Sequence, residues 1–332
     1  MPRHLLGLRE LGRPEIEELL DAAQGIADRE GWGNALAGRT VASLFYEPST
    51  RTELSFDLAA KRLGAEMLRC DVDHSSVQKG ESLLDTARTI EALGADALVI
   101  RHPASGAPWL VSRHVTCAVI NAGDGMHEHP TQGLVDLLTV RQRLGRIAGL
   151  RITIVGDLRH SRVARSAAWG FSKLGAQVTL VGPQTLLPAD RGALPVRCTT
   201  SFEEGLDGAD VVMALRMQLE RQAGGDVPSL AEFTSRYGLT ERVLARTAPG
   251  AIVMHPGPMN IGIELREDVA SGPRSVIQHQ VRNGLYVRMA ALIWALAAES
   301  PQSSRSPQST RSPAMHSRFN GDLVTGKTVK TG

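Results

Sequence analysis

Segments typical of strands and of helices alternate along most of the chain, and this alternation limits the folds open to it. The clearest example runs from a β-rich segment at 151–156 (RITIVG) through an amphipathic segment at 162–174 to a second β-rich segment at 177–182 (QVTLVG). A strand, a helix and a strand in this order predict two parallel strands joined by a right-handed crossover. The pattern therefore favours an α/β protein with parallel sheets.

The alternation continues on both sides of this unit. Helices are predicted at 14–28, 51–64, 81–93, 130–144 and 280–298, and strands at 40–46, 96–101, 115–120, 210–215 and 251–254. A chain of 332 residues is long enough for two such domains. We predict two doubly wound parallel-sheet domains with an active-site cleft between them, because ligands of such sheets bind at the carboxyl ends of strands. The predicted domains are 1–146, with the helix 280–298 packing back on it, and 147–279.

The last part of the chain differs in composition. SPQSSR at 300–305 recurs as SPQSTR at 306–311. The segment 300–332 has a net charge of +4, and because the whole chain has a net charge of +2, residues 1–299 have a net charge of −2. A segment this polar buries too little apolar surface to offset its chain entropy, so we predict that 299–332 is disordered. The nearly neutral remainder gives no electrostatic reason to expect nucleic acid as a partner.

Composition also bears on the compartment. No apolar run approaches the roughly 18–20 residues that span a bilayer, and the N-terminus has no apolar signal core. Cys70, Cys117 and Cys198 lie far apart and match no zinc or redox spacing. We therefore predict a cytoplasmic protein without a membrane partner.

The segment PSTRT lies between a predicted strand and a predicted helix. A helix N-terminus offers unpaired N–H groups and the positive end of the helix dipole, so it suits phosphate. Ser49, Thr50 and Thr52 add hydroxyl donors, and Arg51 adds a charged fork for phosphate oxygens. The alternative is a capping box formed by Thr50 and Glu53, and one helix end can serve both purposes.

A second polar segment, HPTQ, begins at His129. Pro130 suits the first helical turn, so His129 should stand just ahead of a helix. Its imidazole could donate a hydrogen bond to a carbonyl oxygen, which helps acyl transfer because negative charge develops there. The run His127-Glu128-His129 also suggests zinc, but no third ligand has suitable spacing, so we predict no metal. A histidine that merely caps the helix is the simpler alternative.

Arginines stand at the ends of several predicted strands. Arg101 closes one strand, Arg162 follows another, and Arg216 closes a third, with Gln218 two residues later. A single arginine in such a place is usually a solvated surface residue. Three of them, together with Arg51, predict a site for several anionic groups, because the guanidinium binds carboxylate and phosphate in a two-pronged way.

Two loops complete the candidate site. In SSVQKGES at 75–82, Lys79 could meet a phosphate or carboxylate, although an exposed loop is the simpler interpretation. HPGP at 255–258 predicts a stiff turn that could present backbone carbonyls to a ligand. Residues 1–299 lack the glycine fingerprint of dinucleotide-binding proteins, the Walker motif and the G-x-S-x-G elbow.

Taken in order, these segments resemble the catalytic chains of the aspartate/ornithine carbamoyltransferase family over about residues 1–298. The matching segments are FYEPSTRT (45–52), SSVQKGES (75–82), VIRHP (99–103), INAGDGMHEHPTQ (120–132), GDLRHSRVARS (156–166), ALRMQLER (214–221) and HPGPMN (255–260). The ornithine enzymes have a Cys in the segment where this chain has HPGP, and an acidic patch for a cationic acceptor. Here Arg216 and Gln218 fit an acceptor with an additional carboxylate, so the resemblance is to the branch that uses aspartate.

The resemblance implies a reaction and an assembly. The carbamoyl group of carbamoyl phosphate would pass to the α-amino group of L-aspartate, giving N-carbamoyl-L-aspartate and phosphate, a committed early step of de novo pyrimidine (UMP) biosynthesis. No metal and no organic cofactor would be needed. A homotrimer with shared active sites is implied, in which Ser76 and Lys79 reach a neighbouring subunit's site. Regulatory chains or dihydroorotase are further partners that the resemblance allows.

The resemblance also assigns roles to residues. Carbamoyl phosphate would bind through Ser49, Thr50, Arg51, Thr52, Arg101, His129 and Gln132. Aspartate would bind through Lys79, Arg162, Arg216, Gln218, Gly257 and Pro258. The catalytic residues would be Arg51, Thr52, Lys79, Arg101 and His129. Two residues depart from the family pattern: Glu53 and Ile261 stand where relatives usually have basic residues. Since neither belongs to the implied site, we expect activity.

Three alternatives remain open on the sequence. The chain could be a catalytically impaired homologue that serves as a structural partner, although the main site residues are all present. It could be a carbamoyltransferase that uses another amine. It could also be a dinucleotide-dependent oxidoreductase, which the missing glycine fingerprint disfavours.

Overall fold

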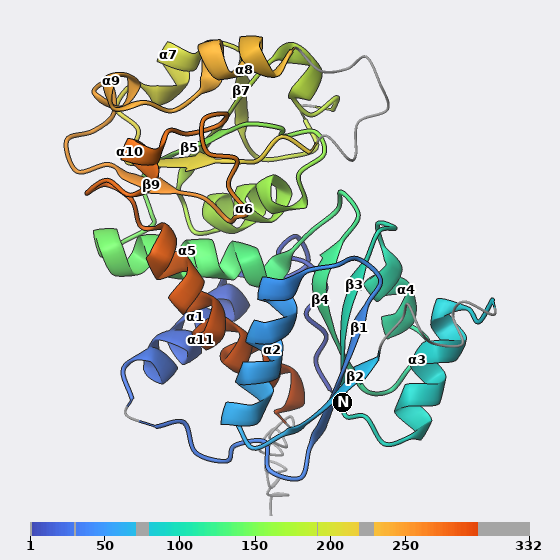
Figure 1. Ribbon diagram of the computed structural model, residues 1–332. Coiled ribbons are helices and arrows are strands. Elements are labelled where there is room, and N and C mark those ends of the chain that lie inside the picture. Colours follow the sequence, from blue (N-terminus) through green and yellow to red (C-terminus); the bar gives the residue numbers. More distant parts are fainter. Residues whose placement is uncertain (1, 30, 71–79, 191, 219–228, 298–332) are drawn as a thin grey trace, which may run out of the picture. The chain divides into compact units, whose positions relative to one another are not determined.

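Two parallel sheets organise the protein. The computed structural model describes residues 2–29, 31–70, 80–190, 192–218 and 229–297 (Figure 1). Within them, one sheet has the strand order β2-β1-β3-β4 and the other the order β7-β6-β5-β8-β9, with all neighbouring strands parallel. The predicted fold class, an α/β protein built on two parallel sheets, is therefore confirmed.

The first sheet is assembled from the N-terminal half of the chain. Its strands are β1 (Thr40–Phe45), β2 (Glu66–Cys70), β3 (Ala97–His102) and β4 (Ala118–Asp124). The helices of this half are α1 (Arg13–Ala27), α2 (Thr50–Arg62), α3 (Leu83–Ala92), α4 (Ala107–Ser112) and α5 (Pro130–Leu144), and α11 (Ile277–Leu296) packs against α1, α2 and α5.

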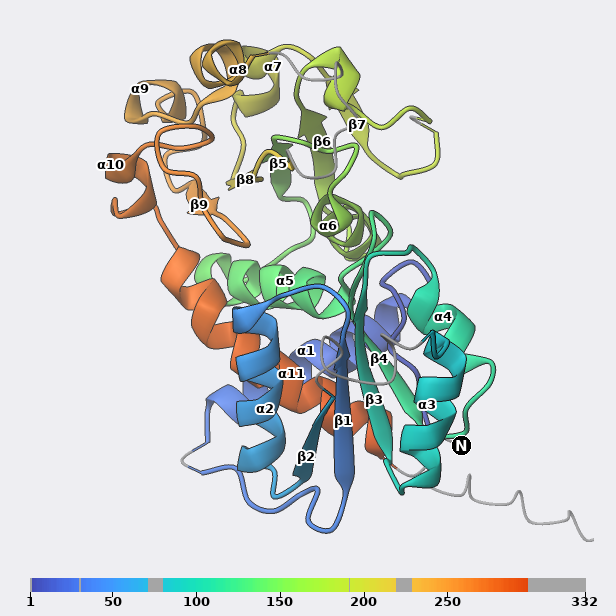
Figure 2. The ribbon, with the colours of Figure 1, turned by 45° about the vertical axis from the view of Figure 1, so that its right-hand side comes forward.

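Alternating side chains of the first sheet enter two different cores, as expected for strands covered on both faces. Val41 and Val99 pack into a core with residues of α1, α2, α5 and α11. Leu44 and Leu98 pack into a core with residues of α3 and α4 on the other face. Figures 1 and 2 agree on this arrangement, with α3 and α4 on one side of the strands.

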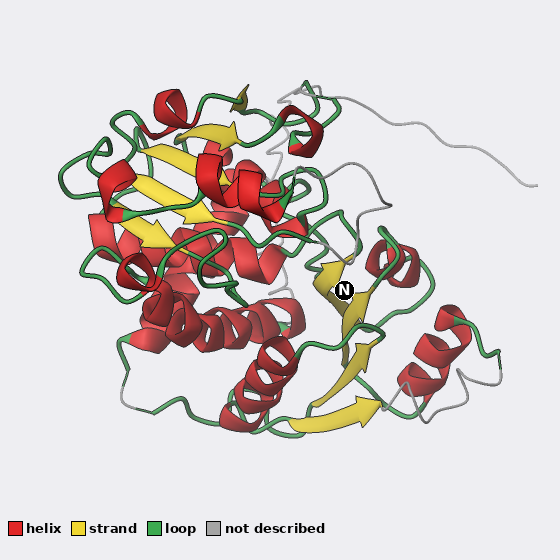
Figure 3. Cartoon of the chain, turned by 45° about the horizontal axis from the view of Figure 1, so that its top comes forward, coloured by secondary structure: helices red, strands yellow, loops and turns green. Residues whose placement is uncertain are grey.

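The second sheet is assembled from the C-terminal half. Its strands are β5 (Arg151–Val155), β6 (Gln177–Val181), β7 (Arg197–Thr199), β8 (Val211–Ala214) and β9 (Ile252–Met254). The helices are α6 (Arg162–Lys173), the 3-10 helix η3 (Gln184–Leu186), α7 (Phe202–Leu206), α8 (Leu230–Tyr237), α9 (Glu241–Leu244) and α10 (Glu267–Ala270). Helices pack around this sheet as well (Figure 3).

The second sheet shares a core with the first. Ile152 and Ile154 on one face of β5 pack with residues of α5 and α6, in the same continuous core that holds Val41 and Val99. Val155 faces the opposite way, into a core with residues of α7, α8 and α9. Because α5 and α6 pack against each other, one apolar core runs from sheet to sheet, which restricts their relative displacement.

Two elements of the first half were not predicted, and one strand is displaced. β2 has charged residues along a poorly buried edge, and α4 is only six residues long, so both give weak sequence patterns. The strand predicted at 115–120 is β4, which runs on to Asp124 because the asparagine, glycine and aspartate that read as a loop are buried in the strand. In the part of the chain that the structure describes, every helix is too short or too polar to cross a bilayer.

Candidate active site

A cleft of about 830 Å³ collects residues from both sheets. It is lined by the ends of β1, β3 and β8, by the first turns of α2, α5 and α6, and by the turn after β9. The predicted site residues that lie on it are Ser49, Thr50, Arg51, Thr52, Arg101, His129, Gln132, Arg162, Arg216, Gln218, Gly257 and Pro258. Lys79 and Ser76 lie outside the described residues. Parallel topology explains this convergence, since the carboxyl ends of the strands meet at one edge.

The first turn of α2 presents donors to the cleft. Ser49 is the N-cap, but its side chain makes no cap hydrogen bond; its hydroxyl donates instead to Thr52 Oγ1 at 3.0 Å. The predicted capping box of Thr50 and Glu53 is therefore wrong, because the helix begins one residue earlier than that motif requires. The backbone N–H groups of this turn are left without a side-chain cap, and together with Arg51 they suit an anion.

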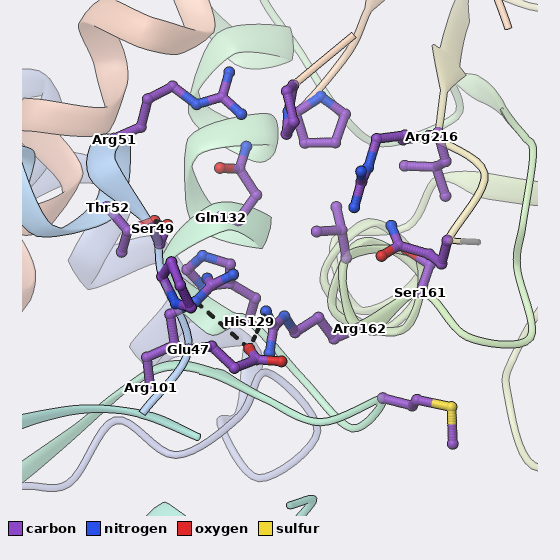
Figure 4. Close-up of a pocket in the computed structure, with 18 of the residues that line it drawn as sticks. Glu47, Ser49, Arg51, Thr52, Arg101, His129, Gln132, Ser161, Arg162 and Arg216 are labelled. Atoms are coloured by element: carbon purple, nitrogen blue, oxygen red, sulfur yellow. Dashed lines mark hydrogen bonds and ion pairs between the residues drawn. The ribbon is translucent and has the colours of Figure 1, made fainter. Parts of the chain in front are cut away.

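Four arginines extend from different elements into this cleft. Arg51 comes from α2, Arg101 from the end of β3, Arg162 from the start of α6, and Arg216 from the segment after β8 (Figure 4). Arg101 and Arg162 are largely buried, with 14% and 6% of their side chains exposed. So much positive charge at the edge of a folded core would be unfavourable without anionic partners, and it suits a ligand with several negative groups.

Glu47 is the partner that the sequence analysis missed. Its Oε2 accepts a hydrogen bond from Arg162 Nη2 at 2.7 Å and lies 3.6 Å from Arg101 Nε (Figure 4). Among the described residues that line the cleft, Glu47 is the one acid. It stands inside the segment FYEPSTRT, but only the folded chain shows that its carboxylate joins an arginine at the end of β3 to one at the start of α6.

Gly123 leaves room for the guanidinium groups of Arg101 and Arg162 next to its backbone. Its φ is +115°, and a Cβ there would lie 3.0 Å from Arg162 Nε and 3.2 Å from Arg101 Nη1. A side chain at this position would be strained in its backbone and would also displace both guanidinium groups. Arg101 Nη1 in turn donates to the carbonyl of Ala122 at 3.2 Å.

His129 is buried at the start of α5, as the sequence predicts, with Pro130 in the first turn. Its backbone N–H donates to Ser166 Oγ at 2.9 Å, which fixes the start of the helix. Burial, and after it the positive charges of Arg101, Arg162 and Arg288, hold the pKa of His129 well below its usual value. The imidazole is therefore neutral near pH 7 and can act as a hydrogen-bond donor without carrying charge.

Asp136 lies behind the cleft and is completely buried. Gln132 Nε2 donates to its Oδ1 at 2.9 Å, and Gln280 Nε2 of α11 donates to the same oxygen at 2.8 Å. Burial outweighs these hydrogen bonds and raises the pKa of Asp136 to about 7. Gln280 Oε1 then accepts the backbone N–H of His255 at 2.9 Å, so a polar chain runs from Gln132 to the turn after β9.

The turn after β9 is fixed by its own histidine. The N–H of Gly257 donates to His255 Nδ1 at 2.8 Å, and His255 Nε2 lies 3.2 Å from Glu264 Oε1. Gly257 has a φ of +69°, and a Cβ there would collide with the guanidinium of Arg51. This close approach brings the turn against the first turn of α2, where the sequence placed the phosphate group.

Arg162 and Gln218 are positioned by a helix cap and by a loop contact. Ser161 caps α6 by accepting the N–H of Ala164 at 3.1 Å, which positions Arg162 in the first turn. The N–H of Gln218 donates to the buried Asp157 at 3.3 Å. The two departures from the family pattern lie elsewhere: Glu53 and Ile261 are not among the residues that line the cleft. Among the described residues, no group of three or more His, Cys, Asp or Glu side chains could hold a metal ion.

Known proteins have sequences similar to that of this chain. The chain matches the aspartate/ornithine carbamoyltransferase carbamoyl-P binding domain over residues 3–142 and the Asp/Orn binding domain of the same family over residues 148–295. It is 50% identical over 307 residues to the aspartate carbamoyltransferase catalytic subunit of Roseiflexus castenholzii, covering 90% of this chain and 96% of that one. It is 52% identical over 306 residues to that of Sorangium cellulosum, covering 91% and 95%.

Solved structures show the same relationship. Aspartate transcarbamoylase from Trypanosoma cruzi in complex with carbamoyl aspartate and phosphate aligns with a TM-score of 0.82 at 31% identity, covering 89% of this chain and 97% of that one. Ornithine carbamoyltransferase from Thermus thermophilus aligns with a TM-score of 0.81 at 27% identity, covering 90% and 100%. With both domains and nearly the whole length of such relatives matched, this chain belongs to the aspartate/ornithine carbamoyltransferase family.

Proposed function

We propose that this protein transfers the carbamoyl group of carbamoyl phosphate to the α-amino group of L-aspartate, giving N-carbamoyl-L-aspartate and phosphate. One observation carries the proposal: a single cleft joins the uncapped start of α2, the neutral His129 and four arginines. Such a cleft suits two anionic reactants held side by side. The roughly 50% identical relatives that bear the name aspartate carbamoyltransferase support the same reaction.

Carbamoyl phosphate would lie at the start of α2. Ser49, Thr50, Arg51 and Thr52 would hold its phosphate, since that helix end supplies hydroxyl, guanidinium and backbone donors. The roles of these residues are part of the proposal, as are those of Arg101 and His129, which would donate to the carbonyl oxygen. Gln132 would hold the amide.

Aspartate would lie on the side of the second sheet. Arg162, Arg216 and Gln218 would hold its two carboxylates, with Gly257 and Pro258 in the adjoining turn. The neutral α-amine would attack the carbonyl carbon, and the negative charge on the oxygen would be met by Thr52, Arg101 and His129. Collapse breaks the bond from carbon to the phosphate oxygen, and the departing phosphate can accept the proton released by the amine. Most of the rate gain would come from positioning and preorganised charge.

The assembly and the cellular setting belong to the same proposal. By the family resemblance, the chain forms a cytoplasmic homotrimer in which Lys79 of one subunit enters the site of the next. Its product would feed pyrimidine biosynthesis, and regulatory chains or dihydroorotase would be candidate partners. The domain limits proposed are 1–146 with 280–298 for the carbamoyl phosphate side and 147–279 for the aspartate side. The segment 299–332, which the sequence predicts to be disordered, lies outside the described residues.

The direct test is an assay of carbamoyl transfer with aspartate and with ornithine as acceptors. We expect product with aspartate only, because Arg216 repels the cationic side chain of ornithine and attracts a second carboxylate. No product with either acceptor at saturating carbamoyl phosphate would favour the impaired homologue, and product with ornithine would favour another amine.

The acceptor preference can be traced to one side chain. Arg216→Ala should raise the KM for aspartate by about tenfold or more and leave the KM for carbamoyl phosphate nearly unchanged, since it removes a charge-assisted contact to one substrate only. Arg236→Ala, on the exposed face of α8, is the matched control and should change neither constant. Equal changes in both KM values would contradict the assignment of Arg216.

A further inference from the structure

The buried carboxyl group of Asp136 has no part in the mechanism described above, yet it touches a residue of the site. It lies on α5, one turn after Gln132, and is 0% exposed. Its Oδ1 accepts from Gln132 Nε2 at 2.9 Å and from Gln280 Nε2 at 2.8 Å, while its Oδ2 has no hydrogen-bond partner among the described residues. A buried carboxyl group is costly, which calls for a reason why an apolar residue does not stand there.

The two glutamines show what this carboxyl group accomplishes. A glutamine amide has two chemically different ends, and both orientations fill the same space. Asp136 Oδ1 accepts both hydrogen bonds whether the carboxyl group is ionised or carries its proton on Oδ2, so it selects the orientation in which the nitrogen of Gln132 points back into the core. Gln132 also lines the cleft (Figure 4), and its remaining end, the carbonyl oxygen, is the one that it can offer to a ligand.

The amide of Gln280 is oriented in the same way, with its nitrogen toward Asp136. With its nitrogen bonded to Asp136, its oxygen accepts the N–H of His255 at 2.9 Å. The second amide therefore confirms the direction of the first, because a backbone N–H can only donate. A single acceptor thus sets the orientation of both amides, and it does so from a site without contact to solvent.

We propose that Asp136 is a positioning residue that holds the carbonyl oxygen of Gln132 toward the cleft and thereby selects an acyl phosphate that carries an –NH₂ group. This inference rests on the proposed function. An amide nitrogen on the ligand is a donor and matches the oxygen of Gln132. A methyl group in its place offers no hydrogen and leaves that oxygen unsatisfied.

The test compares two ligands that differ only in having an –NH₂ or a methyl group on the carbonyl carbon. Carbamoyl phosphate is measured by its KM at saturating aspartate, and acetyl phosphate by its inhibition constant as a competitor of carbamoyl phosphate. Asp136→Leu removes the acceptor and keeps the branched shape of the side chain, with two methyl groups in place of the two oxygens. We expect the KM for carbamoyl phosphate to rise about tenfold, the loss of one hydrogen bond, while the inhibition constant of acetyl phosphate stays within about twofold. Asp136→Asn keeps one acceptor oxygen and should return the KM to within about threefold of the unmodified protein.

Thr139→Val is the matched control. Thr139 is equally buried, one turn further along α5, and accepts from Asn283 Nδ2 of α11 at 2.9 Å. Its removal breaks a comparable polar contact between the same two helices and should lower the melting temperature without changing either constant. If Asp136→Leu does not fold, Asp136→Ala removes the same acceptor without added bulk, and the same pattern is expected.

A double substitution tests whether Asp136 acts through Gln132. In a Gln132→Leu background, Asp136→Leu should raise the KM for carbamoyl phosphate no further. The inference is overturned if the leucine variant weakens both ligands equally, if it weakens neither, if asparagine does not restore the KM, or if the two substitutions add. Failure of the unmodified protein to use carbamoyl phosphate would instead overturn the proposed function.

Discussion

Glu47 joins Arg101 of β3 to Arg162 of α6, and its removal should disturb the site. Glu47→Gln keeps the shape but removes the charge that pairs with Arg162 at 2.7 Å. We expect kcat/KM for aspartate to fall by about tenfold or more, because a buried guanidinium that loses its carboxylate must find another position. Steady-state kinetics measure the loss.

Glu53→Gln provides the matched control for Glu47, because it is the same change six residues away, outside the lining of the cleft. It should leave kcat/KM nearly unchanged. If the two variants had equal activity, Glu47 would have no role in holding the arginines.

At the residue scale, the sequence predicted the side chains that lie at strand ends and missed those whose role depends on distant neighbours. Arg101, Arg162 and Arg216 could be placed together because parallel strands bring their carboxyl ends to one edge. Glu47 stood inside a recognised segment, but its two partners are more than fifty residues away. Asp136 gave no signal, since an aspartate in a predicted helix is ordinarily a surface residue.

At the scale of elements, Asp136 lies between α5 and α11 and should make the free energy of unfolding depend on pH. The pKa of Asp136 is raised to about 7 from 3.8, so between these values the folded protein holds a proton that the unfolded chain releases. Fewer protons bound in the unfolded state mean that the free energy of unfolding falls as the pH rises through this window. Asp136→Asn removes the titrating group, so the stability of the asparagine variant relative to the unmodified protein should increase from pH 5 to about pH 7 and then level off.

Urea unfolding at several pH values measures this difference. Thr139→Val supplies the comparison, because it breaks a neighbouring contact without removing a titratable group. Its stability should therefore change with pH in parallel with that of the unmodified protein. Parallel curves for Asp136→Asn as well would show that this carboxyl group does not titrate in the window.

The elements that the sequence predicted are those in which apolar residues recur with a regular period. RITIVG became β5, paired on both sides, and the segment at 162–174 became α6, because each places apolar side chains at the spacing of its own structure. β2 was missed because it is an edge strand, and its charged residues interrupt the regular alternation of apolar and polar side chains that predicts a strand. The end of β4 was missed because asparagine, glycine and aspartate, which usually mark turns, are buried there.

At the scale of the whole molecule, the proposed homotrimer predicts complementation between inactive variants. Lys79→Ala and Arg101→Ala would each abolish every site of their own trimers. If Lys79 belongs to the neighbouring subunit's site, each mixed trimer regains one site with both residues intact, so random mixing should restore about a quarter of the activity. Dissociation, mixing and reassembly followed by the transfer assay measure this recovery. Mixtures no more active than their components would contradict shared sites.

The central claim is that one cationic cleft holds a phosphate group and two carboxylates at the same time, and a single co-crystal structure tests it. N-(phosphonacetyl)-L-aspartate, which occupies the aspartate transcarbamoylase of Trypanosoma cruzi, joins these groups in one molecule. We predict its phosphonate at the first turn of α2 beside Arg51, and its carboxylates at Arg162 and Arg216. A ligand bound outside this cleft, or no binding at saturating concentration, would contradict the account.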